Sequence, residues 1–354
     1  MIGFCLAAGA GTRLSPLTRV TPKPLLAPAG RPLLDLAVEA LAAAGAAWVV
    51  VNAHHGAERL AALLAGRPGV QVVREPVLLG TAGGLANAAR LGLLGGGDDP
   101  VLVTCADHVV DPADLAALAG CLDRLDAKMV AGLIPAARPT FGLRLAGDPV
   151  GGEAGNSAAG HPAGGGEAGD PVAGGRVMRD PGGRWDSAGA YALRAGLLLD
   201  LPPGPAALDA ALLGPLLERG ALAGMPFRGQ VADAGTLHRL LLASAGLLGG
   251  RWPYDLPAGA LLTPTLGGPM LVADGATLHP AATVAGPVVL DRGGRVAAGA
   301  VVTRAIIGPG AEVGVGARIV GSVLGPGARL DPGEVAVAAL LPGPRALPSA
   351  PPLG

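Results

Sequence analysis

Residues 6–25 read LAAGAGTRLSPLTRVTPKPL and continue a short apolar run at the N-terminus. This order predicts a buried strand that ends in a glycine-rich loop. Gly9 and Gly11 can adopt positive φ and carry no side chain, so successive backbone N–H groups can turn toward one phosphate or one base edge. Arg13 and Lys23 place two cations beside the same loop, where they can hold separate phosphate oxygens. The stretch, called the signature loop below, therefore predicts a triphosphate-binding site.

The prolines of the signature loop limit its structure further. Pro22 and Pro24 flank Lys23, fix φ and remove backbone donors, so the lysine is expected on a stiff, non-helical segment. A dinucleotide-binding fingerprint is excluded, because no third glycine follows at the required spacing and the prolines break the helix that it needs.

The loop meets every fixed position of the pattern LAAGxGTRLxPLTxxxPKPL and so resembles the signature of the sugar-1-phosphate nucleotidyltransferases. The resemblance extends to about residue 248 and implies catalytic roles for Arg13 and Lys23. It also implies that this part of the chain supplies several nucleotide-binding residues, namely Leu6, Ala8, Gly9, Gly11 and Thr12.

The composition excludes several classes of protein. A chain of 354 residues is expected to form two domains, and a net charge of -1 gives no electrostatic case for binding nucleic acid. The mean hydropathy is +0.49, yet no apolar run reaches the ~20 residues of a membrane span. No basic segment precedes the first apolar run, so no signal peptide is expected. The three cysteines are a sparse, odd set, which favours a reducing compartment, the cytoplasm.

Hydrophobic periodicity predicts that helices and strands alternate along the first part of the chain. Helices are expected at residues 32–44, 57–64 and 82–94, and strands at 47–51, 70–73 and 101–105. Such alternation predicts a Rossmann-like, doubly wound, mostly parallel sheet covered on both faces. Ligands of such sheets bind at the carboxyl ends of the strands.

A second glycine-rich segment follows one of these strands. Residues 75–84 read EPVLLGTAGG and resemble the family segment EPxxLGTAG, which contacts the base and the sugar of the nucleotide. The resemblance adds Glu75, Gly80, Thr81 and Gly83 to the nucleotide-binding set. The alternative is an ordinary loop with a helix that begins at Thr81.

Two aspartates are the candidate metal ligands. Asp107 follows the strand at 101–105, where the family has Gly-Asp, and residues 231–236, VADAGT, resemble the family step VDVGT. The resemblance implies that Asp107 and Asp233 bind Mg²⁺ as the cofactor. We expect both to reach the same edge of the sheet, and we expect His108 to be a loop residue rather than a ligand.

The candidate sugar-binding residues are Gly142, Ser187 and Gly189. Gly142 resembles the glycine of a family Tyr-Gly step, and residues 187–189 resemble Asn-Ala-Gly with serine in place of asparagine. Residues 179–181 read RDP where many relatives have EKP, so a lysine for the sugar phosphate is missing. These departures leave the sugar open.

Aliphatic residues recur every six positions in the last third of the chain, with two five-residue steps. They are Val272, Leu278, Val284, Leu290, Val296, Val302, Ile307, Val313 and Ile319, followed by Leu324 and Leu330. This period is typical of hexapeptide repeats, whose aliphatic residues point into a coil. The segment resembles a short left-handed β-helix.

These patterns predict four regions: a nucleotidyltransferase domain at 1–248 with a flexible low-complexity insertion at 147–175, a linker at 249–261, a left-handed β-helix at 262–338, and a disordered proline-rich tail at 339–354. The open end and flat faces of a β-helix favour a homo-oligomer that forms through it.

The resemblance implies that the enzyme joins an NTP to a hexose-1-phosphate and releases pyrophosphate, by in-line attack on the α-phosphate. The GTAG segment followed by a β-helix favours mannose-1-phosphate guanylyltransferase. The alternatives are a glucose-1-phosphate uridylyl- or thymidylyltransferase, a catalytically silent regulatory homologue that senses sugar nucleotides, and a bifunctional enzyme whose β-helix transfers acyl groups. The last would require a base in the repeats, where His279 is the only histidine.

Overall fold

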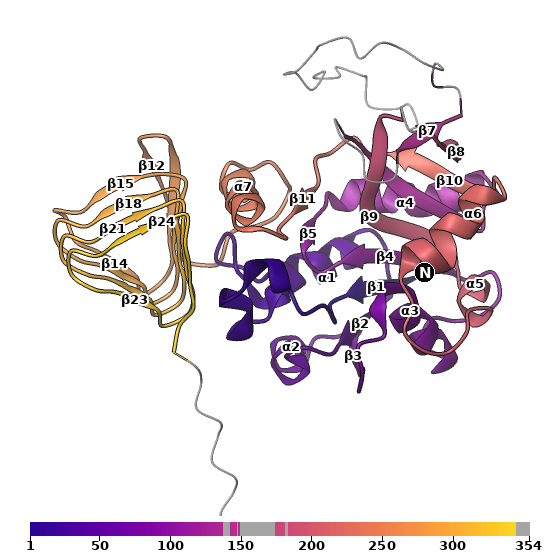
Figure 1. Cartoon of the computed structure of the whole chain (residues 1–354), viewed down its shortest axis with the longest axis horizontal. Coiled ribbons are helices and arrows are strands. Elements are labelled where there is room, and N and C mark those ends of the chain that lie inside the picture. Colours follow the sequence, from indigo (N-terminus) through magenta and orange to yellow (C-terminus); the bar gives the residue numbers. More distant parts are fainter. Residues whose placement is uncertain (137–141, 147, 149–173, 181–182, 345–354) are drawn as a thin grey trace, which may run out of the picture.

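The computed structural model shows an α/β unit beside a stack of short strands (Figure 1). It describes residues 1–136, 142–146, 148, 174–180 and 183–344. The predicted insertion at 147–175 lies outside the described residues, except for Asp148, Gly174 and Gly175. Within the described part of the chain, no helix has the length and apolar character needed to cross a bilayer.

The central nine-stranded sheet has the order β3-β2-β1-β4-β9-β6-β10-β8-β7. Its strands are β1 (Ile2–Leu6), β2 (Trp48–Ala53), β3 (Val70–Arg74), β4 (Pro100–Cys105), β6 (Met129–Pro135), β7 (Leu143–Leu145), β8 (Gly175–Arg179), β9 (Trp185–Arg194) and β10 (Leu222–Pro226). The first four are parallel, and β6 is parallel to β10. β9 runs antiparallel to both β4 and β6, and β8 runs antiparallel to β7 and β10.

The sheet is therefore mixed: the expected parallel pairing holds for β1 to β4 and for β6 with β10, but not for β8 and β9. Parallel neighbours need a crossover connection, which is usually a helix. The described residues between β6 and β9 form the strands β7 and β8 and no helix, so β9 returns antiparallel to β6.

Helices cover both faces of the sheet, as the doubly wound arrangement requires. α1 (Leu33–Ala43), α2 (Ala57–Leu64) and α4 (Pro112–Arg124) enclose one core, which contains Cys5 of β1. α3 (Gly80–Arg90), α5 (Gly196–Leu199), the π-helical turn at Asp209–Leu213 and α6 (Gly214–Glu218) enclose the other, which contains the adjacent Phe4. Successive strand residues thus serve opposite cores.

The helices predicted at 32–44 and 57–64 agree with α1 and α2, whereas α3 begins and ends earlier than the predicted range of 82–94. The signature loop forms three single 3₁₀ turns at Thr12–Leu14, Leu17–Arg19 and Lys23–Leu25. Lys23 is the first residue of the last turn, so the prediction of a non-helical segment for this lysine is wrong.

The stacked strands form three further sheets, here called the coil. One contains β12 (Leu261–Thr265), β13 (Gly268–Val272), β16 (Val288–Leu290), β19 (Ile306–Ile307), β22 (Val323–Leu324) and β25 (Leu340–Leu341). The second contains β14 (Thr277–Leu278), β17 (Arg295–Val296), β20 (Glu312–Val313) and β23 (Arg329–Leu330). The third contains β15 (Thr283–Ala285), β18 (Val301–Thr303), β21 (Arg318–Val320) and β24 (Val335–Val337).

The predicted aliphatic column occupies the interior of the coil. Its members from Leu290 to Leu330 are buried in one core, and Leu290 pairs in parallel with Ile307, which pairs with Leu324. The first five-residue step, from Val302 to Ile307, falls at a corner where Arg304 has φ 45. One turn of the coil further on, the equivalent corner contains Gly321 with φ 55.

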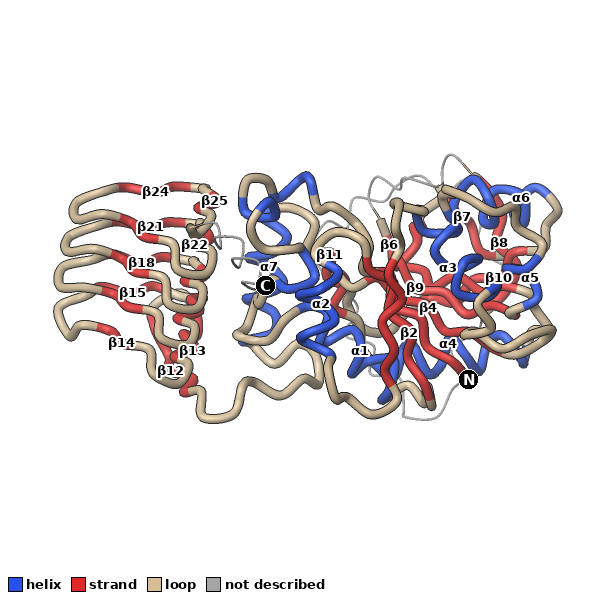
Figure 2. Tube along the Cα trace, turned by 90° about the horizontal axis from the view of Figure 1, so that it is seen from below, coloured by secondary structure: helices blue, strands red, loops and turns tan. Residues whose placement is uncertain are grey.

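The coil packs on the α/β unit, and α7 (Leu237–Leu248) lies on the side of the unit that faces the coil in both views (Figures 1 and 2). Outward-facing residues of the first coil sheet share one core with the signature loop and α7. The members of this interface core include Leu14, Leu17, Leu240, Leu271, Val289, Ile306 and Val323. The coil thus packs against the signature loop and supports it from the side of the interface core.

The predicted linker at 249–261 contacts the α/β unit: Trp252 Nε1 donates to the Gln230 carbonyl at 2.6 Å, and Tyr254 Oη donates to the Val110 carbonyl at 2.6 Å. The predicted end of the repeats needs correction. β25 (Leu340–Leu341) lies within the predicted tail at 339–354, because its residues pair with β22 and extend the first coil sheet. Residues 345–354 lie outside the described part.

Candidate active site

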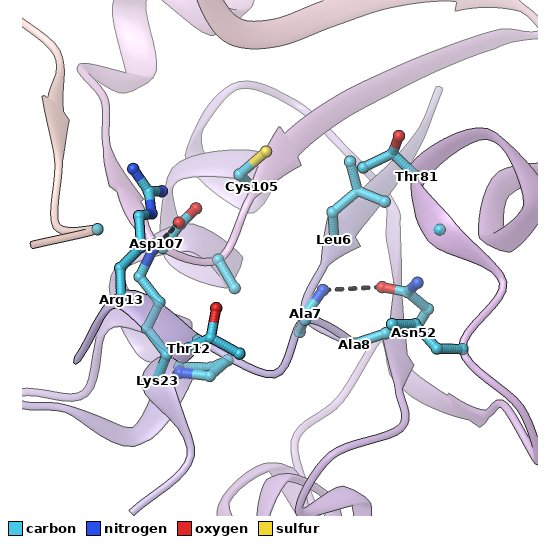
Figure 3. Close-up of a pocket in the computed structure, with 17 residues that line it drawn as sticks. Leu6, Ala7, Ala8, Thr12, Arg13, Lys23, Asn52, Thr81, Cys105 and Asp107 are labelled. Atoms are coloured by element: carbon cyan, nitrogen blue, oxygen red, sulfur yellow. Dashed lines mark hydrogen bonds and ion pairs between the residues drawn. The ribbon is translucent and has the colours of Figure 1, made fainter. Parts of the chain in front are cut away.

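A cavity of about 360 Å³ lies at the carboxyl ends of β1 and β4 (Figure 3). Its walls come from the signature loop, from the start of α3 and from the turn after β4. The lining residues are Leu6, Ala7, Ala8, Gly9, Gly11, Thr12, Arg13, Lys23, Pro24, Asn52, Leu78, Gly80, Thr81, Cys105, Ala106, Asp107 and Gly235. Most of the nucleotide-binding residues predicted from the sequence therefore surround one cavity.

The signature loop depends on Gly11 for its shape. Gly11 has φ 65, and a Cβ at this position would lie 2.9 Å from Lys23 Cβ. Its carbonyl accepts a hydrogen bond from Thr18 Oγ1 at 2.9 Å, which closes the loop on itself. A larger residue would be strained by the backbone conformation and would also separate the two ends of the loop.

Glu75 lies behind the cavity wall rather than in it. Its Oε1 accepts from Asn52 Nδ2 at 2.7 Å and its Oε2 accepts from the Leu79 N–H at 3.1 Å. Asn52 Oδ1 in turn accepts from the Ala7 N–H at 2.8 Å. Glu75 thus supports Asn52, a lining residue that the sequence interpretation missed. The available signal was a polar residue near the end of the buried strand β2.

The second glycine-rich segment has a mixed outcome. Gly80 and Thr81 line the cavity, whereas Gly83 is not among its lining residues. A Cβ at Gly83 would lie 3.1 Å from the Ala206 nitrogen, so this glycine permits close packing of α3 on a neighbouring loop. Thr81 Oγ1 accepts from the Leu208 N–H at 2.7 Å, which fixes the same contact.

The two candidate metal ligands meet at the ammonium group of Lys23. Lys23 Nζ contacts Asp107 Oδ2 directly and lies 3.9 Å from Asp233 Oδ1. Asp233 Oδ2 also contacts Arg239. Asp233 Oδ1 is buried and has no hydrogen-bond partner among the described residues. The site is therefore a compact network of alternating charges with one unsatisfied carboxylate oxygen.

Asp233 reaches this network by a route that the sequence did not predict. It belongs to β11 (Ala232–Asp233), which pairs antiparallel with β5 (His108–Val109) in a separate two-stranded sheet. Asp233 therefore reaches Lys23 from this small sheet and not from a strand of the main sheet. His108 is a residue of this small sheet and not of a loop.

Coulombic contacts set the protonation of this network. Burial opposes the ionisation of Asp107, but His108 and Lys23 together hold the pKa of its carboxyl well below the usual range. Burial likewise opposes the protonation of His108, yet Asp107 and then Cys105 raise the pKa of its ring well above the usual value. His108 Nδ1 lies 3.1 Å from Asp107 Oδ1. The carboxylate form of Asp107 is thus favoured.

A second cavity of about 470 Å³ is lined by His108, the residue after Asp107 of the first cavity. It is lined by His108, Ile134, Asp186, Ser187, Gln230, Val231, Ala232, Asp233, Arg239, Leu242, Arg251 and Trp252. Ser187 Oγ pairs with Tyr191 Oη at 2.8 Å and accepts from the Gly189 N–H at 3.1 Å.

The other two predicted sugar-binding residues do not line this cavity. Gly189 has φ 69, and a Cβ there would lie 2.8 Å from the His108 ring, so it gives room to that ring. Gly142 is not in the lining of either cavity, and its carbonyl accepts from the Asp180 N–H at 2.7 Å.

Part of the chain is similar in sequence to known proteins. Residues 2–142 match the family described as Nucleotidyl transferase. Similar proteins include the N-acetylmuramate alpha-1-phosphate uridylyltransferases of Caulobacter vibrioides and Neisseria meningitidis. The first is 38% identical over 137 residues, which are 35% of this chain and 55% of the relative. The second is 43% identical over 116 residues, which are 31% of this chain and 48% of the relative.

Another relative is the mannose-1-phosphate guanylyltransferase catalytic subunit beta of Drosophila melanogaster, which is 39% identical over 111 residues, 30% of each chain. The matches thus span about half or less of these relatives. A crystal structure of UDP-glucose pyrophosphorylase with UDP-glucose matches with a TM-score of 0.51 and 17% identity, over 70% of this chain and 97% of that one. At this identity the likeness concerns the fold alone.

Residues 2–142 thus resemble a nucleotidyl transferase domain in sequence, and the glycine-rich cavity lies within this stretch for most of its lining. Over this stretch, the chain is similar to enzymes named as sugar-1-phosphate nucleotidyltransferases.

Proposed function

We propose that this protein transfers a nucleotidyl group from an NTP to a sugar-1-phosphate and releases pyrophosphate. The observation that carries the proposal is the convergence of Lys23, Asp107 and Asp233 at one side of the cavity that Arg13 and the glycine loop line. A loop that can hold phosphates thus lies beside two carboxylates suited to a metal ion.

The carboxylates fit the Mg²⁺ ion that this chemistry implies. Asp233 Oδ1 is a buried acceptor without a hydrogen-bond donor, and Asp107 is held in its ionised form. Mg²⁺ favours such oxygen ligands and commonly takes one or two carboxylates together with substrate phosphates. Bound to Asp107 and Asp233, it would supply neutralisation of the phosphate charge.

The residues of this chain perform the remaining steps. Backbone N–H groups at Gly9 and Gly11 bind phosphate oxygens, and Arg13 and Lys23 stabilise the charge that develops on the leaving pyrophosphate. An oxygen of the sugar phosphate attacks the α-phosphorus in line, and the bond from this phosphorus to the pyrophosphate oxygen breaks. Positioning and charge stabilisation are the main contributions of the protein to such transfers.

We assign the nucleotide to the first cavity and the sugar to the second. Asp233 and His108 line the second cavity, and their neighbours Gly235 and Asp107 line the first. Ser187 would hydrogen-bond a sugar hydroxyl, while Gly189 keeps the wall clear by accommodating the His108 ring. Gly142 would act only at a distance from these linings.

The leading substrates are GTP and mannose-1-phosphate. The matched stretch makes up 55% and 48% of the two uridylyltransferases but only 30% of the guanylyltransferase, which is therefore a longer chain with room for a second domain. The presence of the coil favours similarity to the longer guanylyltransferase. We propose that the coil is a left-handed β-helix and a site of homo-oligomerisation. Sequence similarity favours UTP with N-acetylmuramate 1-phosphate as the second candidate.

The test is a grid of GTP, UTP and dTTP against mannose-1-phosphate, glucose-1-phosphate and N-acetylmuramate 1-phosphate, with pyrophosphate release as the readout. We expect release for at least one pair, and we expect a chelator to abolish it. The dTTP and glucose-1-phosphate arms cover the remaining transferase alternatives. If folded protein releases no pyrophosphate from any pair but binds a sugar nucleotide, the silent regulatory role replaces the proposal.

A further inference from the structure

Three different ligand types meet between the two cavities. The Cys105 thiol, the Asp107 carboxylate and the His108 ring offer ligand atoms that all lie within 4.8 Å of one another. Cys105 and Asp107 line the first cavity, and His108 lines the second. Among the described residues, no other group of three histidine, cysteine or acidic side chains is gathered in this way.

Local structure brings the three side chains together. β4 ends at Cys105, a tight turn carries Asp107, and β5 begins at His108. Pairing with Asp233 fixes the backbone of His108, and the absence of a side chain at Gly189 leaves space for the ring. His108 Nδ1 is buried and has no hydrogen-bond partner among the described residues. The same nitrogen lies 3.1 Å from Asp107 Oδ1, so a cation bound between the two groups would replace this contact.

The chemistry of the set differs from that of the two aspartates. Thiolate, imidazole and carboxylate together suit Zn²⁺ and similar borderline cations, whereas Mg²⁺ prefers oxygen ligands alone. Tetrahedral Zn²⁺ with bonds of about 2.0 to 2.3 Å would bring ligand atoms to about 3.5 Å from one another, so side-chain shifts of about 1 Å close the site. The thiol proton and the proton on the ligating nitrogen of the His108 ring would both pass to the buffer on binding.

We propose that Cys105, Asp107 and His108 form a binding site for a borderline divalent cation such as Zn²⁺ or Co²⁺. Such a cation competes with Lys23 for Asp107, because Lys23 contacts the same carboxylate. It also withdraws Asp107 from the Mg²⁺ site assigned above. Zn²⁺ therefore inhibits the Mg²⁺-dependent reaction, and this last consequence alone rests on the proposed function.

Co²⁺ is the probe for the test, because a thiolate ligand gives it a charge-transfer absorption band that oxygen ligands do not. Full-length protein is stripped of metal and titrated with Co²⁺, and Zn²⁺ is then added as a competitor. We expect the thiolate band to appear and Zn²⁺ to remove it. Cys105→Ser should abolish the band, and His108→Gln should weaken Co²⁺ binding by at least the ~10 to 100-fold that loss of an outer-shell partner costs.

Cys121→Ala is the matched control, because Cys121 is buried on α4 outside the cluster. It should leave the band and the affinity unchanged. Circular dichroism and melting temperature confirm that each variant is folded. Absence of the band in folded wild type, or equal Co²⁺ affinity in wild type and Cys105→Ser, overturns the proposal.

Asp233→Asn separates this inference from the proposed function. Asp233 is an assigned Mg²⁺ ligand but not a member of the cluster, so this variant should keep the Co²⁺ band while losing Mg²⁺-dependent pyrophosphate release. If wild type shows the band but releases no pyrophosphate from any substrate pair, the cation site stands and the proposed reaction fails. If wild type releases pyrophosphate but shows no band, the proposed reaction stands and the cation site fails.

Discussion

The ammonium group of Lys23 contacts the carboxylate of Asp107 and also lies 3.9 Å from Asp233 Oδ1. One cation of the signature loop thus balances two carboxylates that are far apart in the sequence. We expect Asp107→Asn and Asp233→Asn each to lower turnover roughly 10² to 10³-fold, if each charge stabilises the transition state by ~3 to 4 kcal/mol. Turnover over a magnesium titration measures this. Near wild-type turnover in either folded variant removes that residue from the site.

The same pair of variants should differ in stability. Lys23 has a buried side chain that contacts Asp107 directly, so Asp107→Asn leaves an ammonium group without its nearest counter-charge. Asp233→Asn leaves the Lys23–Asp107 pair intact. The melting temperature should therefore fall further for Asp107→Asn, with Asp274→Asn, an exposed change in the coil, as the control. Equal melting temperatures for all three variants would show that the pair has no structural role.

Glu75 accepts a hydrogen bond from Asn52, so substitutions of these two residues should have coupled effects on nucleotide binding and stability. Asn52→Ala and Glu75→Ala should each raise the KM for the nucleotide and destabilise the fold by about 1 to 3 kcal/mol, because each leaves buried polar groups unpaired. Since both act through one chain of hydrogen bonds, the double variant should be little worse than either single variant. Additive effects on KM would instead indicate that Glu75 contacts the nucleotide independently.

The sequence predicted best those features whose residues are neighbours in the chain. The signature loop confines Gly9, Gly11, Arg13 and Lys23 to one short segment, so a common cavity follows from any compact fold of that segment. The coil was recognisable for the same reason, because its six-residue period repeats locally.

Features that depend on distant pairing were not predictable in the same way. Hydrophobic alternation along the chain does not encode which strands become neighbours, so it could not place β9 between β4 and β6. Asn52 faces the cavity only because β2 lies beside β1. The route of Asp233 depends on a sheet of two short strands, β5 and β11, which are too short to give a periodic pattern.

The interface core predicts that the coil stabilises the signature loop. Ile306 is buried against the α/β unit, so Ile306→Ala should destabilise the protein by about 2 to 5 kcal/mol. Val315→Ala, at an exposed position of the coil, should stay within about 0.5 kcal/mol of wild type. Urea denaturation measures both. Similar values for the two variants would show that the coil is only loosely attached.

Removal of the whole coil is the stronger form of this test. Truncation before Leu261 exposes Leu17 and Leu240, which the coil covers. We expect a lower melting temperature and a higher KM for the nucleotide, because the signature loop loses its support. Light scattering in the same experiment reports whether the full-length chain forms a larger assembly. A truncated protein with an unchanged melting temperature and an unchanged number of chains per assembly would contradict both the supporting role and the proposed oligomer.

Asp291 gives the pH dependence that the structure predicts most directly. Its carboxyl lies in the interface between the coil and the α/β unit, where burial raises its pKa although the Arg292 N–H, which donates to Oδ1 at 2.7 Å, opposes this shift. Because the folded pKa exceeds the unfolded value of about 3.9, the ionised carboxylate costs stability at neutral pH. This cost disappears as the pH falls through the raised folded pKa toward the unfolded value.

Asp291→Asn keeps an acceptor for the Arg292 N–H but removes the buried charge. The variant should therefore be more stable than wild type at pH 7, and the difference should shrink toward zero near pH 4. The free energy of unfolding is measured for both proteins across this range, so that other titrating groups cancel in the difference. Asp274→Asn is again the control, because its exposed side chain has no such burial cost. A difference that stays constant with pH would show that the Asp291 carboxyl titrates alike in the folded and unfolded chains.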